Sequence, residues 1–526
     1  MIAAVLLSGC DPLQDQADET PAAEGGGTLR FGVAGLRSLE TSSGRGTALV
    51  LLKAACDGLV SLDPDGGEPK PALAESWTIS RDARKVRLTI RQGVLFHDGT
   101  EVDAAAVADS LSRITQPATE SLWGYLLGDV EGFSKVQAGT ASRLSGIAVD
   151  EPNELTITLS SPHADFISLL AHPSLVPTSR GAEKDDDDEV DPGCAGPYRI
   201  EGRRESLRLE RDDEYRGANE AYARRGSGFL DHISIVEFET GNEALEGLLE
   251  GKVQLAAVPA SRAGEPLPGE TGHARRATQE VTYLALGLSG SASDDSRIRQ
   301  SISLAVNRFV IIDAAFGDER QPAIGWLPGF PGPSEVSDCA EFAGRIDDPR
   351  QAKRVFARTG ADPRQITLPL RFDPDRTSGL VANSLVVQVK DILGITLQPT
   401  PVDAAELESS IREESARGMW MFTAEPDVPV LGRTMSRLFG RGSSENLTGF
   451  RSRRFERSLS RARAELDPDT RAERMLDAES TVCGQMPAIP LWTGARHWRY
   501  DPESVLFEGP DVDLWGDVIL RNTRVQ

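Results

Sequence analysis

The residue types that most often perform catalysis are present, but they do not form a recognised catalytic pattern. The six histidines never occur in the H-E-x-x-H spacing that binds zinc, and no G-x-S-x-G sequence marks a nucleophilic serine. A phosphate-binding G-x-x-x-x-G-K-S/T loop is also absent from the sequence. Carboxylates are numerous, so a glycosidase-like acidic pair stays open on residue type alone. We therefore predict a protein that is not an enzyme and that needs no cofactor or metal, with a secreted hydrolase as one alternative.

The five cysteines are too widely spaced for a C-x-x-C metal or redox motif. Cys10 stands apart, which leaves Cys56, Cys194, Cys339 and Cys483. In an oxidising compartment these four could form two disulfides with three possible pairings, and buried free thiols are the alternative.

Length and charge limit the class of protein. The chain has 526 residues, too many for one hydrophobic core, so two or three domains are expected. With 81 acidic and 57 basic residues, the formal net charge is −24. Because a nucleic-acid-binding protein needs a basic face, we expect no nucleic-acid partner.

The first ten residues resemble the end of a bacterial lipoprotein signal. Leu7-Ser8-Gly9-Cys10 is similar to the lipobox. In lipoproteins the lipobox cysteine receives a diacylglycerol on its thiol, and cleavage before this cysteine makes it the new N-terminal residue. The basic segment that usually opens a signal peptide is missing. Residues 11–27 are polar, acidic and rich in Ala, Pro and Gly, as is typical of a flexible tether. We predict a signal over residues 1–10, lipidation at Cys10, and attachment to the outer face of the cytoplasmic membrane.

Apolar periodicity predicts alternating strands and helices from residue 28 onward. Residues 29–33 and 86–90 are expected to be strands, and residues 49–62 to be a helix. Asp103 is positioned to cap a helix with one apolar face. That face would carry Val107, Leu111 and Ile114.

Segments along the chain resemble the bacterial extracellular solute-binding proteins of family 5, the peptide, nickel and oligosaccharide receptors of ABC importers. The segment that begins at Arg297 is expected to be a helix with a buried stripe of apolar side chains. The stripe would consist of Ile298, Ile302, Ala305 and Phe309. The matching segments, in the family's order, are residues 73–80, 91–100, 196–200, 229–254, 297–308, 348–360, 446–450 and 487–491.

The resemblance implies an α/β fold of the periplasmic-binding-protein type II. Such proteins are two-lobed clamps with mixed sheets, and this family adds a subdomain to the N-terminal lobe. The N-terminal lobe is expected over residues 28–275 and 485–526, with the subdomain at about 61–184. The C-terminal lobe is expected over residues 276–484.

The resemblance also implies a position for the ligand. In peptide-binding members, a carboxylate of the second lobe pairs with the α-ammonium of the ligand. An alignment without gaps puts Ala424 at that position and keeps Asp427 as the family's second acid, whereas a one-residue gap puts Glu425 there. Either acid is a candidate partner for the ligand, with turn and helix-capping roles as the alternative.

Other candidate ligand-binding residues are aromatic or polar. Trp326, Trp420 and Trp492 could form walls of a cleft, because tryptophan combines a large apolar area with one N–H donor, and plain core packing is the alternative. Asn446 could bond to a ligand backbone or stabilise a turn.

These observations predict an ABC-transporter substrate-binding lipoprotein that captures short peptides or similar small solutes by hinge closure. Its expected partners are the solute, the ABC permease subunits and the membrane, and we expect a monomer. An envelope sensor or chaperone of the same fold is the second alternative.

Overall fold

The computed structural model describes most of the chain beyond the predicted signal and tether. The described residues are 26–36, 39, 46–180, 192–202, 206–215, 230–262, 265, 271–287, 294–317, 320–327, 339, 348–374, 376–403, 406, 418–425 and 427–526. The predicted lipidation site Cys10 and residues 11–25 of the predicted tether lie outside them. None of the helices in the described ranges combines the length and the apolar character that crossing a bilayer requires.

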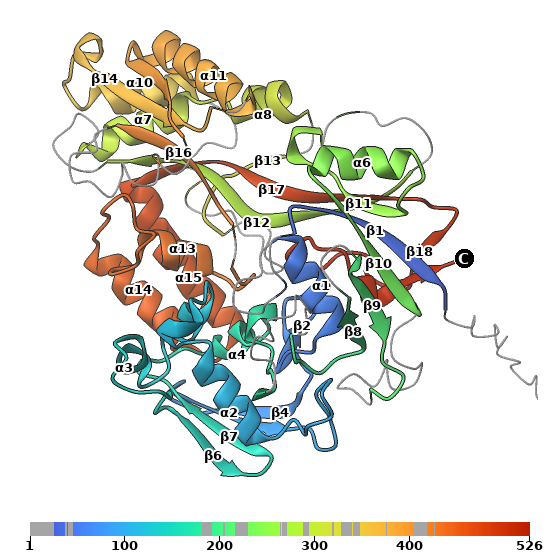
Figure 1. Cartoon of the computed structure of the whole chain (residues 1–526). Helices are drawn as coiled ribbons and strands as arrows, with labels where there is room; N and C mark the ends of the chain where they lie inside the picture. The colour runs from blue at the N-terminus through green and yellow to red at the C-terminus, as the bar shows by residue number, and fades with distance from the viewer. Residues whose placement is uncertain are drawn as a thin grey trace, which may run out of the picture.

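One long mixed sheet runs through the molecule (Figure 1). Its strand order is β15-β14-β16-β12-β17-β11-β1-β10-β9-β8, and β13 pairs with β17. The sheet is parallel where β1 meets β10 and β11 and where β14 meets β15 and β16, and it is antiparallel at its centre. The strands are β1 (Thr28–Ala34), β8 (Tyr198–Glu201), β9 (Arg208–Arg211), β10 (His232–Phe238), β11 (Leu255–Ala257), β12 (Gly272–Leu286), β13 (Gln321–Pro322), β14 (Thr367–Phe372), β15 (Thr396–Pro401), β16 (Met419–Ala424) and β17 (Ala488–Tyr500).

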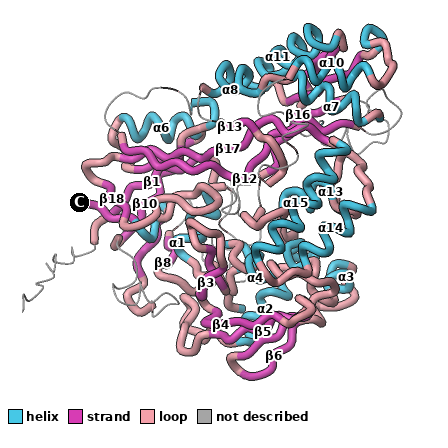
Figure 2. Tube along the Cα trace, turned by 180° about the vertical axis from the view of Figure 1, so that it is seen from behind, coloured by secondary structure: helices cyan, strands magenta, loops and turns pink. Residues whose placement is uncertain are grey.

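Two long antiparallel strands, β12 and β17, connect two lobes. On one side, β17 pairs with β11, and the first lobe continues through β1, β10, β9 and β8. On the other side, β12 pairs with β16, and the second lobe continues through β14 and β15. The expected α/β two-lobed clamp is thus confirmed (Figures 1 and 2). The first lobe also holds α1 (Thr47–Ala55), α6 (Gly241–Leu249) and the hairpin of β18 (Val505–Phe507) and β19 (Thr523–Val525).

The second lobe has helices on both faces of its sheet because side chains alternate along each strand. Leu284 and Leu286 of β12 join one core with α7, α8, α10 and α11. Tyr283 and Ala285 point the other way and join a core with α13, α14 and α15. These helices are α7 (Ser296–Ala305), α8 (Arg308–Phe316), α10 (Pro349–Ala357), α11 (Arg376–Leu393), α13 (Arg433–Phe439), α14 (Arg453–Arg463) and α15 (Pro468–Gln485).

A subdomain with its own sheet adjoins the first lobe (Figure 2). Its strand order is β4-β5-β7-β6, and all neighbours are antiparallel. Asp103 accepts a hydrogen bond from the Ala106 N–H at 2.7 Å, so the predicted helix cap is confirmed. The elements are β4 (Ala74–Ile79), β5 (Lys85–Ile90), β6 (Ile147–Glu151), β7 (Glu154–Thr158), α2 (Ala104–Arg113), α3 (Phe133–Gln137) and α4 (Phe166–Leu169), and a hairpin of β2 (Val60–Leu62) and β3 (Pro69–Pro71) leads into it.

The predicted residue limits of the lobes stay predictions. The limit at residues 275 and 276 falls within β12, a strand that both lobes share.

Two local predictions were wrong. The helix expected over 49–62 ends at Ala55, and its last residues form β2, because Cys56 leaves the helix in an extended conformation. The apolar stripe expected on one helix belongs to two helices. Ile298, Ile302 and Ala305 are buried in α7, but Phe309 lies in α8 and is 50% exposed. Asn307 begins the new helix α8 by accepting a hydrogen bond from the Val310 N–H, which turns Phe309 outward.

The four widely spaced cysteines form two disulfides. Cys56 pairs with Cys194 in the core of the first lobe, and Cys339 pairs with Cys483 in the second lobe. The structure thus selects one of the three possible pairings and excludes free thiols at these positions.

Candidate functional site

The segment that follows β16 carries both predicted acids and lies between the lobes. β16 ends at Ala424, the exposed Glu425 follows, and Asp427 is buried with 3% of its surface exposed. The Glu425 carboxylate is therefore accessible to a ligand in this structure, whereas the Asp427 carboxylate is not.

Two arginines neutralise Asp427. Arg433 and Arg437 are four residues apart on α13, so their side chains lie on the same face of the helix. Arg433 donates from Nε and Nη2 to Asp427 Oδ2 at 2.9 and 2.7 Å. Arg437 Nη1 lies 3.3 Å from Asp427 Oδ1, and its Nε and Nη2 donate to Glu445 at 2.8 and 2.6 Å. Two carboxylates and two guanidinium groups thus form a compact, formally neutral cluster.

Residues of other parts of the chain complete the coordination of Asp427. The Tyr125 hydroxyl of the subdomain donates to Asp427 Oδ2 at 3.0 Å. The indole N–H of Trp515, in the C-terminal segment, donates to the Asp427 backbone carbonyl at 3.0 Å. Asp427 therefore joins the second lobe to the subdomain and to the end of the chain.

The charges around Asp427 keep it ionised. Burial alone would raise the pKa of Asp427, but the positive charges of Arg433 and Arg437 outweigh that effect and hold the pKa well below its usual range. Burial and the charge of Asp427 both raise the pKa of the Tyr125 phenol, so it stays a neutral donor. The cluster is a set of permanent charges and not a proton-transfer group.

Glu425 has a different role available to it. Its backbone carbonyl accepts a hydrogen bond from Arg437 Nη1 at 2.9 Å, which fixes the chain, while its side chain stays exposed. The pKa of Arg496 is raised mainly by the charge of Asp517, and the charge of Glu425 adds to this rise. A fixed backbone and an exposed carboxylate are what binding of a cationic group requires.

All three candidate tryptophans are buried in the second lobe. Trp326 and Trp420 are 1% exposed in the core beneath α13 to α15, and Trp492 is 3% exposed in the core on the other face of the sheet. Among the described residues, the indole N–H groups of Trp326 and Trp420 have no hydrogen-bond acceptor. Their burial agrees with the core-packing alternative, and contact with a ligand stays a prediction.

Asn446 stabilises a turn in this structure. Its side-chain carbonyl accepts from the Phe450 N–H at 3.1 Å, and its amide donates to the Phe450 carbonyl at 2.9 Å. This matches the turn alternative, and a bond to a ligand remains untested.

Among the described residues, one group could bind a metal by its composition. The Sγ atoms of Cys339 and Cys483 and a carboxylate oxygen of Glu479 lie within 4.8 Å of one another. Because the two sulfurs are bonded to each other, neither is a thiolate ligand. Glu479 also accepts a hydrogen bond from the Trp326 backbone N–H. The group is therefore a disulfide with an adjacent buried acid.

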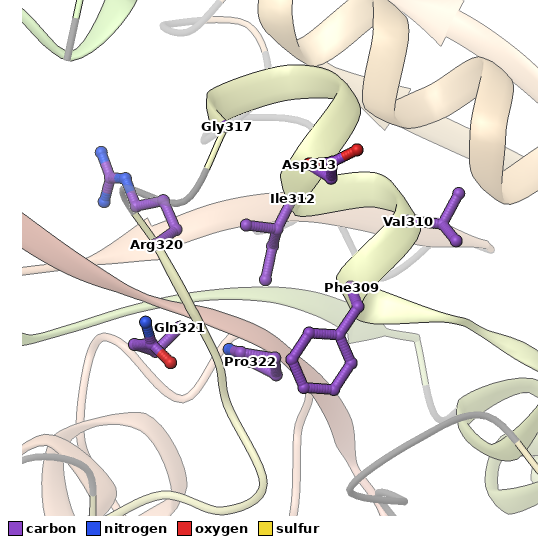
Figure 3. A pocket seen from close by; sticks show the side chains of 8 residues that line it. All are labelled: Phe309, Val310, Ile312, Asp313, Gly317, Arg320, Gln321 and Pro322. Carbon is purple, nitrogen blue, oxygen red and sulfur yellow. The ribbon is translucent and has the colours of Figure 1, made fainter. Parts of the chain in front are cut away.

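A pocket of about 460 Å³ lies at α8 and β13 (Figure 3). Trp492, one of the predicted ligand-binding residues, adjoins it, because Trp492 pairs with Pro322 of β13. Phe309, Ile312 and Pro322 give it an apolar wall, and Arg320 stands at its edge. Arg320 donates to Glu280 of β12 at 2.7 Å, so the pocket adjoins one of the strands that connect the lobes.

Sequence reasoning missed the partners of Asp427. The spacing of Arg433 and Arg437 is a recognisable sequence signal, because residues four apart share a helix face. Tyr125 and Trp515 are 302 and 88 residues from Asp427, and no local pattern links residues at such separations.

Two lobes with mixed sheets, connected by β12 and β17 and extended by a subdomain, define a clamp of the periplasmic-binding-protein type II. The chain belongs to the bacterial extracellular solute-binding proteins, family 5, whose model matches residues 68–443. The resemblance noted in the sequence is therefore confirmed.

Individual relatives are more distant. The chain is 23% identical to the dipeptide-binding protein DppE of Bacillus subtilis over 455 residues, which cover 83% of this chain and 80% of the relative. It is 25% identical to the glutathione-binding protein GsiB of Salmonella paratyphi A over 461 residues, 84% of this chain and 83% of the relative. The structure resembles the ABC transporter substrate-binding protein CtaP of Listeria monocytogenes with a TM-score of 0.77 and 19% identity, covering 95% of this chain and 99% of CtaP.

Proposed function

We propose that this protein is the substrate-binding lipoprotein of an ABC importer and captures short peptides between its two lobes without altering them. The observation that carries the proposal is the pair of strands β12 and β17, which connect two separately packed lobes within one family-5 fold. A solute that touches both lobes only in the closed arrangement shifts the population toward closure.

The connecting strands have features that suit a hinge. Their register shifts between Ala277 and Val281 and again between Thr282 and Tyr283. Such irregularities interrupt a hydrogen-bond ladder and let a strand bend locally. Opposite them, a Cβ atom at Gly494 would lie 2.6 Å from the Glu280 side chain, so a larger residue there would force that side chain to move. We infer that the lobes rotate about this part of β12 and β17.

A peptide ligand is supported by the relatives and by one exposed carboxylate. The names of DppE and GsiB describe binding of a dipeptide and of glutathione. Asp427 is already paired with two arginines, so an incoming ammonium would have to displace one of them. Glu425 is exposed and follows a fixed backbone, so we assign to it the pairing with the ligand's α-ammonium.

The cellular setting follows from the family and the cysteines. Family-5 proteins are extracellular, and two disulfides are typical of an oxidising compartment. We propose lipidation at Cys10, a flexible tether, a monomeric protein and delivery of the solute to ABC permease subunits.

The assignment of Glu425 predicts a specific loss of affinity. Wild-type protein should bind short peptides with a free amino terminus about 10- to 100-fold more tightly than the same peptides after N-acetylation, because a charge-assisted hydrogen bond is lost. Glu425→Gln should remove this difference, as measured by isothermal titration calorimetry. Glu473→Gln, at an exposed acid on α15, is the control and should bind like wild type. An unchanged preference in Glu425→Gln would refute the assignment.

A further inference from the structure

Two arginines stand opposite each other on the strands that connect the lobes (Figure 1). Arg276 of β12 and Arg496 of β17 are paired in register, so their side chains leave the sheet on the same face, which we call the arginine face. Like charges placed directly opposite each other on neighbouring strands repel and destabilise the pair. An anion near each guanidinium group removes this cost, and the two arginines differ in this respect.

Arg496 already has acidic partners. It forms an ion pair with Asp517, and the charge of Asp517 raises the pKa of Arg496, with a further contribution from Glu425. Asp517 also accepts a hydrogen bond from Lys53 of α1 at 2.6 Å, and Lys53 forms a second ion pair with Asp513. The charge of Arg496 is therefore balanced by side chains of this chain.

Arg276 has no such partner within the described ranges. Its side chain is only partly exposed, yet its guanidinium forms neither a hydrogen bond nor an ion pair with the residues that the structure describes. This uncompensated positive charge stands in a chain whose formal net charge is −24. A guanidinium group donates two parallel N–H bonds to the two oxygens of a carboxylate, so Arg276 is available to bind one.

The arginine face is connected to the segment that carries Glu425. Trp515 of the C-terminal segment donates its indole N–H to the Asp427 carbonyl at 3.0 Å. The next residue packs against the arginine face, because a Cβ atom at Gly516 would lie 2.9 Å from Arg496 Cβ. One short piece of chain therefore touches both the arginine face and the segment after β16, which places the two on the same side of the connecting strands.

Arg276 and Glu425 are complementary in charge. Among the described residues, neither side chain forms an ion pair, and Glu425 is exposed. A short peptide with free termini carries an ammonium group and a carboxylate, and each added residue moves the two groups apart by up to about 3.6 Å. A cation and an anion held at fixed positions therefore favour peptides of a narrow range of lengths.

We propose that Arg276 binds a carboxylate of the solute while Glu425 binds its α-ammonium, so that the site selects short peptides that carry both charges. The proposal rests on the proposed function, the capture of short peptides, and adds a second charged contact to it. The carboxylate is the C-terminus of the peptide or an acidic side chain close to the amino terminus, since both present the same two oxygens.

Isothermal titration calorimetry with dialanine and trialanine tests the contact. Wild type should bind the free acids about 10- to 100-fold more tightly than the C-terminal amides, because a charge-assisted hydrogen bond is lost. Arg276→Met should remove this preference and keep the preference for a free over an acetylated amino terminus. Arg275→Met changes an exposed neighbour that points to the opposite face and should keep both preferences. If Arg276→Met still prefers the acids, or loses both preferences, the proposal is overturned.

The amide of Ala-Glu identifies the source of the carboxylate. If it binds wild type as weakly as the amide of Ala-Gln, the C-terminus supplies the group that Arg276 binds. If it binds as tightly as dialanine, and Arg276→Met abolishes that gain, an acidic side chain also serves.

A measurement without peptide separates failure of this proposal from failure of the proposed function. Because Arg276 faces a like charge, Arg276→Met should melt at the wild-type temperature or above it in thermal unfolding of the unliganded full chain. A melting temperature well below those of wild type and Arg275→Met would show that the guanidinium stabilises the fold, which contradicts a free anion-binding group. Wild type that binds peptides but treats acids and amides alike contradicts the role of Arg276 alone, whereas wild type that binds no peptide contradicts the proposed function.

Discussion

Asp427→Ala is expected to lower the free energy of unfolding by about 3–5 kcal/mol, because it leaves two buried guanidinium groups without their shared carboxylate. Arg433 donates two hydrogen bonds to Asp427, and Arg437 lies within ion-pair distance of it. Among the described residues, Arg437 has a second carboxylate partner, Glu445, and Arg433 has none. The Tyr125 hydroxyl would lose its acceptor as well, and an unsatisfied buried donor adds to the loss.

Equilibrium urea denaturation measures the effect, and Glu425→Ala is the matched control. Glu425 is two residues away, but its side chain is exposed, so its removal should change the free energy of unfolding by no more than about 0.5 kcal/mol. Equal stability of the two variants would contradict the role of Asp427 as a structural anchor.

The second large effect is expected at the disulfide between Cys56 and Cys194. The bond closes a loop with a sequence separation of 138 residues, so it removes many conformations from the unfolded chain. Loop-closure entropy predicts that Cys56→Ser/Cys194→Ser lowers the free energy of unfolding by about 5 kcal/mol.

Thermal unfolding with and without a reductant measures this contribution. The double variant should melt well below wild type, and reduction should lower its melting temperature further because Cys339 and Cys483 remain paired. Replacing Ser460, an exposed residue of α14, by alanine provides a control with little expected effect. A melting temperature of the cysteine variant equal to that of wild type would show that the bond does not stabilise the fold.

Much of the fold could be predicted because its signals are local. The first strand, the strand at 86–90 and the Asp103 cap each depend on a few neighbouring residues, and the structure has all three. Several segments that match the family in the same order along the chain then indicated the two-lobed clamp. A single segment would not have been enough for this prediction. Phe309 was misplaced because apolar spacing continues across Asn307, where one helix ends and the next begins.

The site was harder to predict because its partners come from distant parts of the chain. The sequence identified Glu425 and Asp427 as alternatives, but only the structure shows that Asp427 is buried with two arginines and Glu425 is exposed. The contacts of Tyr125 and Trp515 depend on how the lobes meet, which periodicity does not describe. The same holds for Arg463, whose charge has no sequence signal that links it to Asp129.

Native mass spectrometry of freshly purified protein tests capture of an unaltered solute most directly. We expect a population heavier than the bare chain by the mass of short peptides, and release under denaturing conditions should return those peptides with intact bonds. Incubation with an added peptide should increase the heavier population without producing fragments. Cleavage of the peptide, or no bound mass with any peptide supplied, would contradict capture between the two lobes.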